Sequence, residues 1–318
     1  EKAKNHGFNA VLMEVYNGKH AWFTSRRLKT EEPLLEKLAE AGKAADVEVH
    51  AWMWTMPNNI PEIVEGHSDW YAVNRAGQPA NTFPAYVPYY RFMCSSHPEV
   101  QEFVRQNVAE LASIKGVAGV HLDYVRLPDA ILAEALQPKY HIVQDKEYPE
   151  YDYCYCEKCR AGFKAMTGLD PLKNLEDPTA NAQWRQYRYD TITHLVNDIL
   201  VPEVRKAGRK ITAAVFPNWE SVRQEWRNWE LDGYLPMLYH NFYNAGIPWI
   251  GQQLTEKISE LKKKSPVYSG LFLPALKPEE LEEAWQTSME AGASGLALFN
   301  YDSITEEHWK ALKSLLVK

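Results

Sequence analysis

Short β-rich runs alternate with longer segments of helical period along this chain, and no other feature constrains its fold as strongly. The eight runs are Asn9–Val15, Glu48–Trp54, Tyr90–Cys94, Val117–Asp123, Ile211–Phe216, Gly233–Leu238, Val267–Leu273 and Gly295–Phe299. Helical patterns fit between them at Pro33–Ala45, Pro98–Ser113, Trp184–Lys206, Ile250–Lys264 and Pro278–Ala291. Eight strand–helix units predict a single (β/α)₈ TIM barrel over residues 1–318, with a doubly wound open sheet as the alternative.

The longest interruption of this pattern lies at about residues 124–183, between the fourth run and the helix near Trp184. It holds a tyrosine-rich stretch, Tyr148–Tyr155, and three of the four cysteines. In a barrel, this loop follows the C-terminal end of a strand, which is the end where active sites lie. Long ordered loops in compact domains are usually functional, so we expect this one to shape a site.

Composition narrows the class of partner. The chain has 35 Lys and Arg against 42 Asp and Glu, a net charge of −7, which disfavours nucleic acid and anionic membranes as partners. No run of about 18 apolar residues predicts a transmembrane helix. The 11 Trp and 18 Tyr favour carbohydrate, because a flat aromatic ring packs on the C–H face of a sugar while the hydroxyls stay hydrogen-bonded. We therefore expect an oligo- or polysaccharide substrate.

A carboxylate at the end of the fourth run is the leading catalytic candidate. Side chains alternate along a strand, so His121 and Asp123 point the same way, toward the barrel axis. A carboxylate there is costly to bury unless it is paired or used. Arg126 lies just beyond and is expected to hold Asp123 ionised, as a nucleophile requires. The alternative is a structural Asp–Arg or Asp–His pair at the barrel rim.

The segment His121–Pro128, of sequence HLDYVRLP, resembles the strand-four signature of the family 10 glycosyl-hydrolase-like proteins, bacterial envelope proteins also known as domain of unknown function 187. Similar motifs follow the same order along the chain at His50–Trp54, His97–Val100, Ala213–Pro217, Gln224–Trp226 and Leu235–Tyr239. The resemblance implies a barrel acting on bacterial or plant polysaccharide, and export to the periplasm or cell surface. It also implies that Asp123 corresponds to the strand-four catalytic aspartate of amylase-like barrels. Some members carry a second Asp where this chain has Tyr124.

Glycoside hydrolysis usually needs a second carboxyl group. Glu220 is the favoured acid, because the apolar ring of Trp219 beside it could raise its pKa. Glu225 and Glu14 are the alternatives. Amylase-like barrels with this placement retain anomeric configuration, so retention is predicted, with Asp123 as nucleophile. Further side chains expected near the substrate, or else packed under loops, are Tyr16, Trp52, Trp54, His121, Arg126, Asn218, Trp219, Tyr239, His240 and Asn300. A non-catalytic carbohydrate-binding barrel is the competing function, and a glutamate facing Asp123 would decide against it.

The cysteines suggest a structural metal. Cys154, Cys156 and Cys159 form a C-x-C-x₂-C cluster in the long loop, and Cys94 ends the third run. Four thiolates form a closed tetrahedral zinc site, with no open position for catalysis. The arrangement is similar to the zinc site of family 42 β-galactosidases. Disulfides or reduced, packed thiols are the alternatives. A zinc-dependent hydrolase is disfavoured because the cysteines would occupy every coordination position and no H-E-x-x-H motif supplies an open site.

Overall fold

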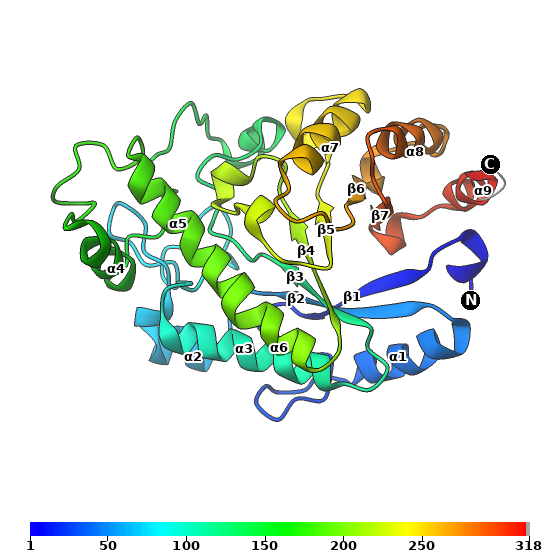
Figure 1. Cartoon of the computed structure of the whole chain (residues 1–318), viewed down its shortest axis with the longest axis horizontal. Coiled ribbons are helices and arrows are strands. Elements are labelled where there is room, and N and C mark those ends of the chain that lie inside the picture. Colours follow the sequence, from blue (N-terminus) through cyan, green and yellow to red (C-terminus); the bar gives the residue numbers. More distant parts are fainter. Residues whose placement is uncertain (316–318) are drawn as a thin grey trace.

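The computed structural model describes residues 1–315 and contains, within them, seven parallel strands in two hydrogen-bonded sheets. The strands are β1 (Ala10–Tyr16), β2 (Glu48–Trp54), β3 (Gly119–Asp123), β4 (Lys210–Val215), β5 (Gly233–Pro236), β6 (Tyr268–Phe272) and β7 (Gly295–Phe299). β1 to β5 form one sheet in chain order, and β6 pairs with β7. Parallel bridges from Tyr234 to Val267 and from Met237 to Gly270 join the two sheets. The strands therefore follow one another side by side in sequence order, as in a TIM barrel (Figure 1).

The strand residues divide between two faces. In β2, the alternate residues Val49, Ala51 and Met53 are at most 1% exposed and belong to the hydrophobic core under the helices. In β3, the alternate residues Val120 and Leu122 are buried in the same hydrophobic core. The residues between them on both strands point to the inner side, which fits the period of two expected for a strand.

Helices connect the strands and cover the outer face. They are α1 (Leu34–Ala45), α2 (Pro61–Gly66), α3 (Pro98–Ser113), α4 (Glu157–Thr167), α5 (Ala182–His194), α6 (Val201–Lys206), α7 (Pro248–Glu260), α8 (Leu281–Glu290) and α9 (Glu306–Leu315). A π-helical segment, Leu195–Leu200, joins α5 to α6, so they form one long rod that crosses the view in Figure 1. α2, α3 and α7 each begin with proline, whose missing N–H costs nothing in the first turn.

The third β-rich run, Tyr90–Cys94, is not a strand of the sheet, and β2 pairs directly with β3. Its backbone instead bonds to the long connection between β2 and α3. The amides of Asn58 and Ala72 donate to Arg91 and Phe92, and Cys94 donates to Trp70. These hydrogen bonds occupy backbone groups of Tyr90–Cys94 that would otherwise pair with neighbouring strands of the sheet. The prediction of a strand here was therefore wrong. Asp123 therefore ends the third strand of the structure rather than a fourth.

The N-terminal residues lie against α9, the last described helix, near β1 and β7 (Figure 1). A short helical turn, η1 (Lys4–His6), packs on α9 through the ring of Trp309, whose centroid lies 4.6 Å from that of His6. Lys2 pairs with Glu306 at 2.7 Å. Within residues 1–315 no strand ladder joins β7 to β1, so these side-chain contacts connect the first and last units.

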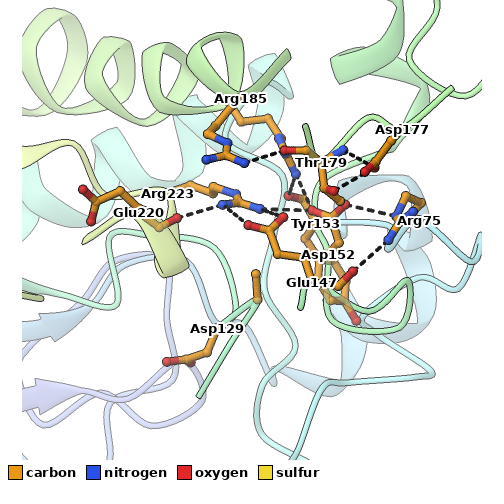
Figure 2. A network of polar contacts seen from close by, with 12 residues as sticks. Arg75, Asp129, Glu147, Asp152, Tyr153, Asp177, Thr179, Arg185, Glu220 and Arg223 are labelled. Atoms are coloured by element: carbon orange, nitrogen blue, oxygen red, sulfur yellow. Dashed lines mark hydrogen bonds and ion pairs between the residues drawn. The ribbon is translucent and has the colours of Figure 1, made fainter. Parts of the chain in front are cut away.

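The long segment after β3 contains the 3₁₀ segment η3 (Glu134–Tyr140) and α4, which the sequence patterns did not predict. A buried ion-pair network anchors it, as Figure 2 shows. Asp152 is fully buried and contacts Arg75, Arg188 and Arg223, which come from the connection after β2, from α5 and from the connection after β4. The network joins three other parts of the molecule to this loop. No helix within residues 1–315 has the length and apolar character needed to cross a membrane.

Candidate active site

Two carboxyl groups and two indoles meet where the first three strands end. Trp52 and Trp54 lie two residues apart on β2, so they share the inner face of the strand. The Trp52 Nε1 donates to Asp123 Oδ2 of β3 over 3.1 Å, and the Trp54 Nε1 donates to Glu14 Oε2 of β1 over 3.0 Å. β2 therefore lies between two carboxyl groups and supplies one donor to each.

Asp123 is 9% exposed, and some features of its environment raise its pKa while others lower it. Burial raises the pKa of Asp123 to about 6, although the Tyr124 amide, the Arg126 charge and the Trp52 indole all favour the ionised form. The Tyr124 amide donates to Asp123 Oδ1 over 2.7 Å. Tyr124 has φ +52°, a left-handed conformation uncommon for an aromatic residue, and this sharp turn ends the strand at Asp123.

Glu14 is half-buried beside this group. Burial raises the pKa of Glu14, the hydrogen bond from Trp54 opposes that rise, and the negative charge of Asp123 adds to it. The influence of Asp123 on the pKa of Glu14 means that the two carboxyl groups act on each other. Among the three glutamates considered from the sequence, Glu14 is the one that the structure brings to Asp123.

Aromatic rings at or just after the ends of β5, β6 and β7 pack next to Trp52. Tyr239, which follows β5, stacks on Phe299 at the end of β7, with centroids 6.1 Å apart. Phe299 also meets the edge of Trp52, at 6.0 Å, and lies 6.2 Å from Phe272 at the end of β6. Burial raises the pKa of Tyr239, and the charge of Asp123 raises it further, so this phenol is close to the carboxylate. Phe272 and Phe299 were not predicted as site residues, although Phe299 ends a β-rich run, as Asp123 does, and Phe272 lies one residue before the end of another.

Arg126 favours the ionised form of Asp123, although its ion pair is with Asp129. Its Nη1 donates to Asp129 Oδ2 over 3.0 Å and to the Leu127 carbonyl over 2.9 Å, and both members of the Arg126–Asp129 pair are buried. Four aromatic rings surround the guanidinium, the nearest being Phe216 with a centroid 4.6 Å away.

The structure does not bring Glu220 or Glu225 to the two carboxyl groups. Glu220 is exposed in η5 (Trp219–Val222), and its side chain extends away from the buried network in Figure 2, linked there only through its backbone oxygen. Its charge acts on Tyr189 and Arg227 instead. Glu225 is 3% exposed and bonds to Arg227 and to Gln186 of α5. The Trp219 ring packs against Tyr189 and under the guanidinium of Arg227, which pairs with Glu225.

The remaining candidate residues lie in different parts of the structure, some buried and some after the ends of strands. The His121 ring bonds to Thr212 over 2.9 Å, and burial lowers its pKa to about 3, so it is neutral inside the sheet. Tyr16 is 1% exposed and belongs to the core. Asn218, after β4, accepts from the Tyr243 hydroxyl over 2.8 Å. Two candidates follow the ends of β5 and β7, namely His240 and Asn300.

The four cysteines converge in a buried cluster between the connections after β2 and β3. The sulfur atoms of Cys94, Cys154, Cys156 and Cys159 all lie within 4.8 Å of one another. Cys94 Sγ lies 3.2 Å from Cys156 Sγ and 3.5 Å from Cys159 Sγ. A tetrahedron with Zn–S bonds of about 2.3 Å has sulfurs about 3.8 Å apart, whereas a disulfide needs about 2.05 Å. The free, clustered thiols therefore fit a metal ion rather than disulfides.

Comparison with known families agrees with this architecture. Residues 1–285 match the family described as glycosyl hydrolase-like 10. The chain belongs to that family. No curated protein gives a significant match to this member of the glycosyl hydrolase-like 10 family.

Solved structures support the fold. The glycoside hydrolase domain of PgaB (BpsB) from Bordetella bronchiseptica has a TM-score of 0.74 at 15% identity, covering 98% of this chain and 90% of that domain. A β-galactosidase from the psychrophilic Marinomonas ef1 has a TM-score of 0.67 at 12% identity, covering 99% of this chain and 55% of that one. The GH42 β-galactosidase Gan42B from G. stearothermophilus has the same TM-score and identity, covering 99% and 53%. The chain thus spans about half the length of these two galactosidases, and the likeness confirms the TIM-barrel fold class.

The chemistry open to this glycosyl hydrolase-like 10 site follows from its parts. Two interacting carboxyl groups with raised pKa values can supply an acid and a base or nucleophile near neutral pH. The aromatic rings next to Trp52 offer flat, apolar faces for a sugar. The four thiols of the cysteine cluster are buried and lie against one another, and none of them contacts the carboxyl pair within the part of the chain that the structure describes.

Proposed function

We propose that the protein is a glycoside hydrolase whose carboxyl pair is Asp123 and Glu14. The observation that carries the proposal is the arrangement around β2, in which Trp52 donates to one carboxyl group and Trp54 to the other. Glycosidic bond cleavage needs two carboxyl groups on either side of the bond. Glu14 replaces Glu220 as the acid in this proposal, because of the three candidate glutamates Glu14 is the one whose pKa the charge of Asp123 affects.

The proposed roles follow from the local electrostatics. Asp123 accepts two hydrogen bonds, from an amide and an indole, which favour its ionised form, whereas Glu14 accepts one. The charge of Asp123 raises the pKa of Glu14 and so keeps the proton on Glu14 at higher pH. Glu14 is therefore the proton donor to the leaving oxygen. Asp123 is the nucleophile, and a carboxylate that forms a covalent glycosyl intermediate implies retention. The amylase-like placement on neighbouring strands does not apply to this pair, because β2 lies between β1 and β3.

The metal proposal concerns structure. We propose that Cys94, Cys154, Cys156 and Cys159 hold zinc, which would tie the connection after β3 to the connection after β2. The thiolates would fill all four positions of a tetrahedral ion, so the metal would take no part in bond cleavage. The substrate is proposed to be an oligo- or polysaccharide of bacterial or plant origin, and export of the protein remains a prediction.

Hydrolysis by single-site variants tests the carboxyl pair. The substrates are 4-nitrophenyl glycosides of glucose, galactose and N-acetylglucosamine, together with soluble β-glucan, galactan and solubilised glycan strands of peptidoglycan. We expect Asp123→Asn to lower kcat at least about 1000-fold on every substrate that the parent cleaves. Glu14→Gln lowers turnover strongly on the glycans and much less on the nitrophenyl glycosides, because a good leaving group needs little protonation.

The control variants are Glu220→Gln and Glu225→Gln. Neither should separate glycans from activated substrates in this way. If Glu220→Gln shows that separation and Glu14→Gln does not, the acid is Glu220. Proton NMR of the first-formed anomer tests retention. A parent protein that binds a glycan of the panel but cleaves none would favour the non-catalytic carbohydrate-binding barrel.

A further inference from the structure

We infer that a two-tiered row of aromatic side chains beside the carboxyl pair binds successive sugar units, so that the preferred substrate is a glycan chain rather than a single terminal sugar. The upper tier is Trp54, Tyr89 and Tyr140. This inference rests on the proposed function and adds to it the length of substrate that the site recognises.

The row begins at the carboxyl pair itself. Trp54 donates to Glu14 at the end of β1, and its ring lies 5.6 Å from that of Tyr89, centroid to centroid. Tyr140 is linked to Tyr89 through Tyr86 and Tyr90, whose rings meet in succession. A sugar stacked on Tyr89 would therefore be continuous with one bound at Glu14.

Each ring of the upper tier stands on a more deeply placed tyrosine. Trp54 packs on Tyr124 at 4.6 Å, Tyr89 on Tyr90 at 5.3 Å and Tyr140 on Tyr86 at 5.7 Å. The lower tier is itself continuous, because Tyr90 lies 6.1 Å from Tyr124 and 6.4 Å from Tyr86. The platform thus offers three supported ring positions in succession, which is more than one sugar ring needs.

Burial separates Tyr89 from the tyrosines of the lower tier. Tyr86, Tyr90 and Tyr124 pack against the hydrophobic core, and burial raises the pKa of each. Tyr86 is also anchored by its hydroxyl, which donates to the Asp129 carbonyl over 2.7 Å. Tyr89, in contrast, is 44% exposed, so its ring is accessible to a ligand.

The chemistry of the upper tier suits a glycan better than an apolar partner. Tyrosine and tryptophan present a flat apolar face and one polar group, which matches a sugar with its C–H face on the ring and its hydroxyls in water. The three rings come from β2, from the connection between β2 and α3, and from η3 in the long segment after β3. The cysteine cluster and the Asp152 network anchor these same two connections, so the platform is held in place in the folded protein.

Chain-length dependence of hydrolysis tests the inference. The probes are the disaccharide through hexasaccharide series of whichever panel glycan the parent cleaves, and the nitrophenyl glycoside of the same sugar. We expect kcat/KM of the parent to rise with chain length. Tyr89→Ala should lower kcat/KM about 10-fold on the hexasaccharide, which corresponds to about 1.4 kcal/mol, and leave the nitrophenyl glycoside within 2-fold. Tyr140→Ala should act in the same direction on the longest chains only.

Tyr301→Ala is the matched control, because Tyr301 is 58% exposed and its ring packs on Trp309 of α9, away from this row. It should change none of these values. Affinity electrophoresis of the Asp123→Asn protein in gels containing the cleaved polysaccharide provides a second readout, in which Tyr89→Ala should reduce retardation.

Hydrolysis with no rise in kcat/KM along the series overturns the platform and leaves the glycosidase intact. Equal effects of Tyr89→Ala on the hexasaccharide and on the nitrophenyl glycoside also overturn it, as does an equal effect of Tyr301→Ala. If no substrate of the panel is cleaved, the proposed function fails, and the inference that rests on it fails with it.

Discussion

Trp52 and Asp123 lie on adjacent strands, and the indole of the first donates to the buried carboxylate of the second over 3.1 Å. Burial raises the pKa of Asp123 to about 6, and this hydrogen bond is one of three interactions that keep the value from rising further. The same strand carries Trp54, which does the same for Glu14. The pKa of each carboxyl group can therefore be changed by replacing its tryptophan donor, without replacing the carboxyl group itself.

Trp52→Phe removes a donor to Asp123 while keeping an aromatic ring. A hydrogen bond to a charged group contributes about 1.5–3 kcal/mol, and about 1.4 kcal/mol corresponds to one pH unit. We expect the pKa of Asp123 to rise, so the acidic limb of the kcat/KM profile should move up by about one pH unit. An unchanged acidic limb would show that Asp123 is not the group that must be ionised.

Trp54→Phe tests the other carboxyl group by the same logic. Loss of this donor should raise the pKa of Glu14, and the basic limb of the profile, where the acid loses its proton, should move to higher pH. Because the two groups interact, both limbs report on the pair, but the larger movement should be on the basic side. The contrast with Trp52→Phe is the internal control, and identical shifts in the two variants would contradict the assignment of roles.

Asp123→Asn should stabilise the folded protein at neutral pH. The rise of the Asp123 pKa from 3.8 to about 6 corresponds to about 3 kcal/mol that the ionised group costs the fold. This cost is absent below pH 3.8 and complete above about pH 6, because the folded-state pKa is the higher one. We expect the gain to be about 1–2 kcal/mol, since Trp52 loses a charged acceptor. Urea unfolding at pH 7.5 and pH 4 measures it, and equal effects at both values would contradict the reasoning.

Asp152→Asn should destabilise the protein strongly. Burial alone would raise the pKa of Asp152, but Arg188 and Arg223 lower it below 3.8, so its stabilising effect is present above that pH and is lost as the pH falls further. Removing a buried partner from such a network costs about 3–5 kcal/mol because the remaining charges stay buried. Urea unfolding at neutral pH measures the loss. The control is Asp46→Asn, which breaks an exposed pair with Lys4 and should have no measurable effect.

Removal of the metal should loosen the connections after β2 and β3 without abolishing hydrolysis. Metal analysis of protein purified without chelator should find one zinc per chain, and chelation should release it. Hydrogen exchange should then increase around Cys94 and residues 154–159, while kcat on nitrophenyl glycosides falls by less than about 10-fold, because the Asp152 network still anchors the loop. Cysteines found as disulfides, or a preparation without metal, would contradict the proposal.

Much of the fold was predictable because it depends on local periodicity. The helix predicted at Pro98–Ser113 has these bounds in the structure, and β2 and β7 match their predicted runs. The segment Tyr90–Cys94 has the composition of a strand but bonds elsewhere. Strand propensity describes a side chain that fits a half-buried extended surface, and a segment pairing with residues 56–58 and 70–72 meets that condition without joining the sheet.

The candidate site also has features that the sequence predicted and features that it did not. The sequence by itself determined that Asp123 ends a strand with its side chain inward, since alternation and the following turn are local properties. Arg126 was assigned to Asp123 from proximity in sequence, although Asp129, three residues beyond the arginine, is equally near and takes the ion pair.

Only the tertiary structure decided which second carboxylate meets Asp123. Glu14 lies more than one hundred residues away from Asp123 along the chain, and the two approach each other because β1 and β3 flank β2 in one parallel sheet. Glu220 is nearer in sequence, but it lies in a helical turn beyond β4 that directs its side chain toward Tyr189. Strand order and the direction of each loop set these distances, and both depend on packing of the whole chain rather than on any local pattern.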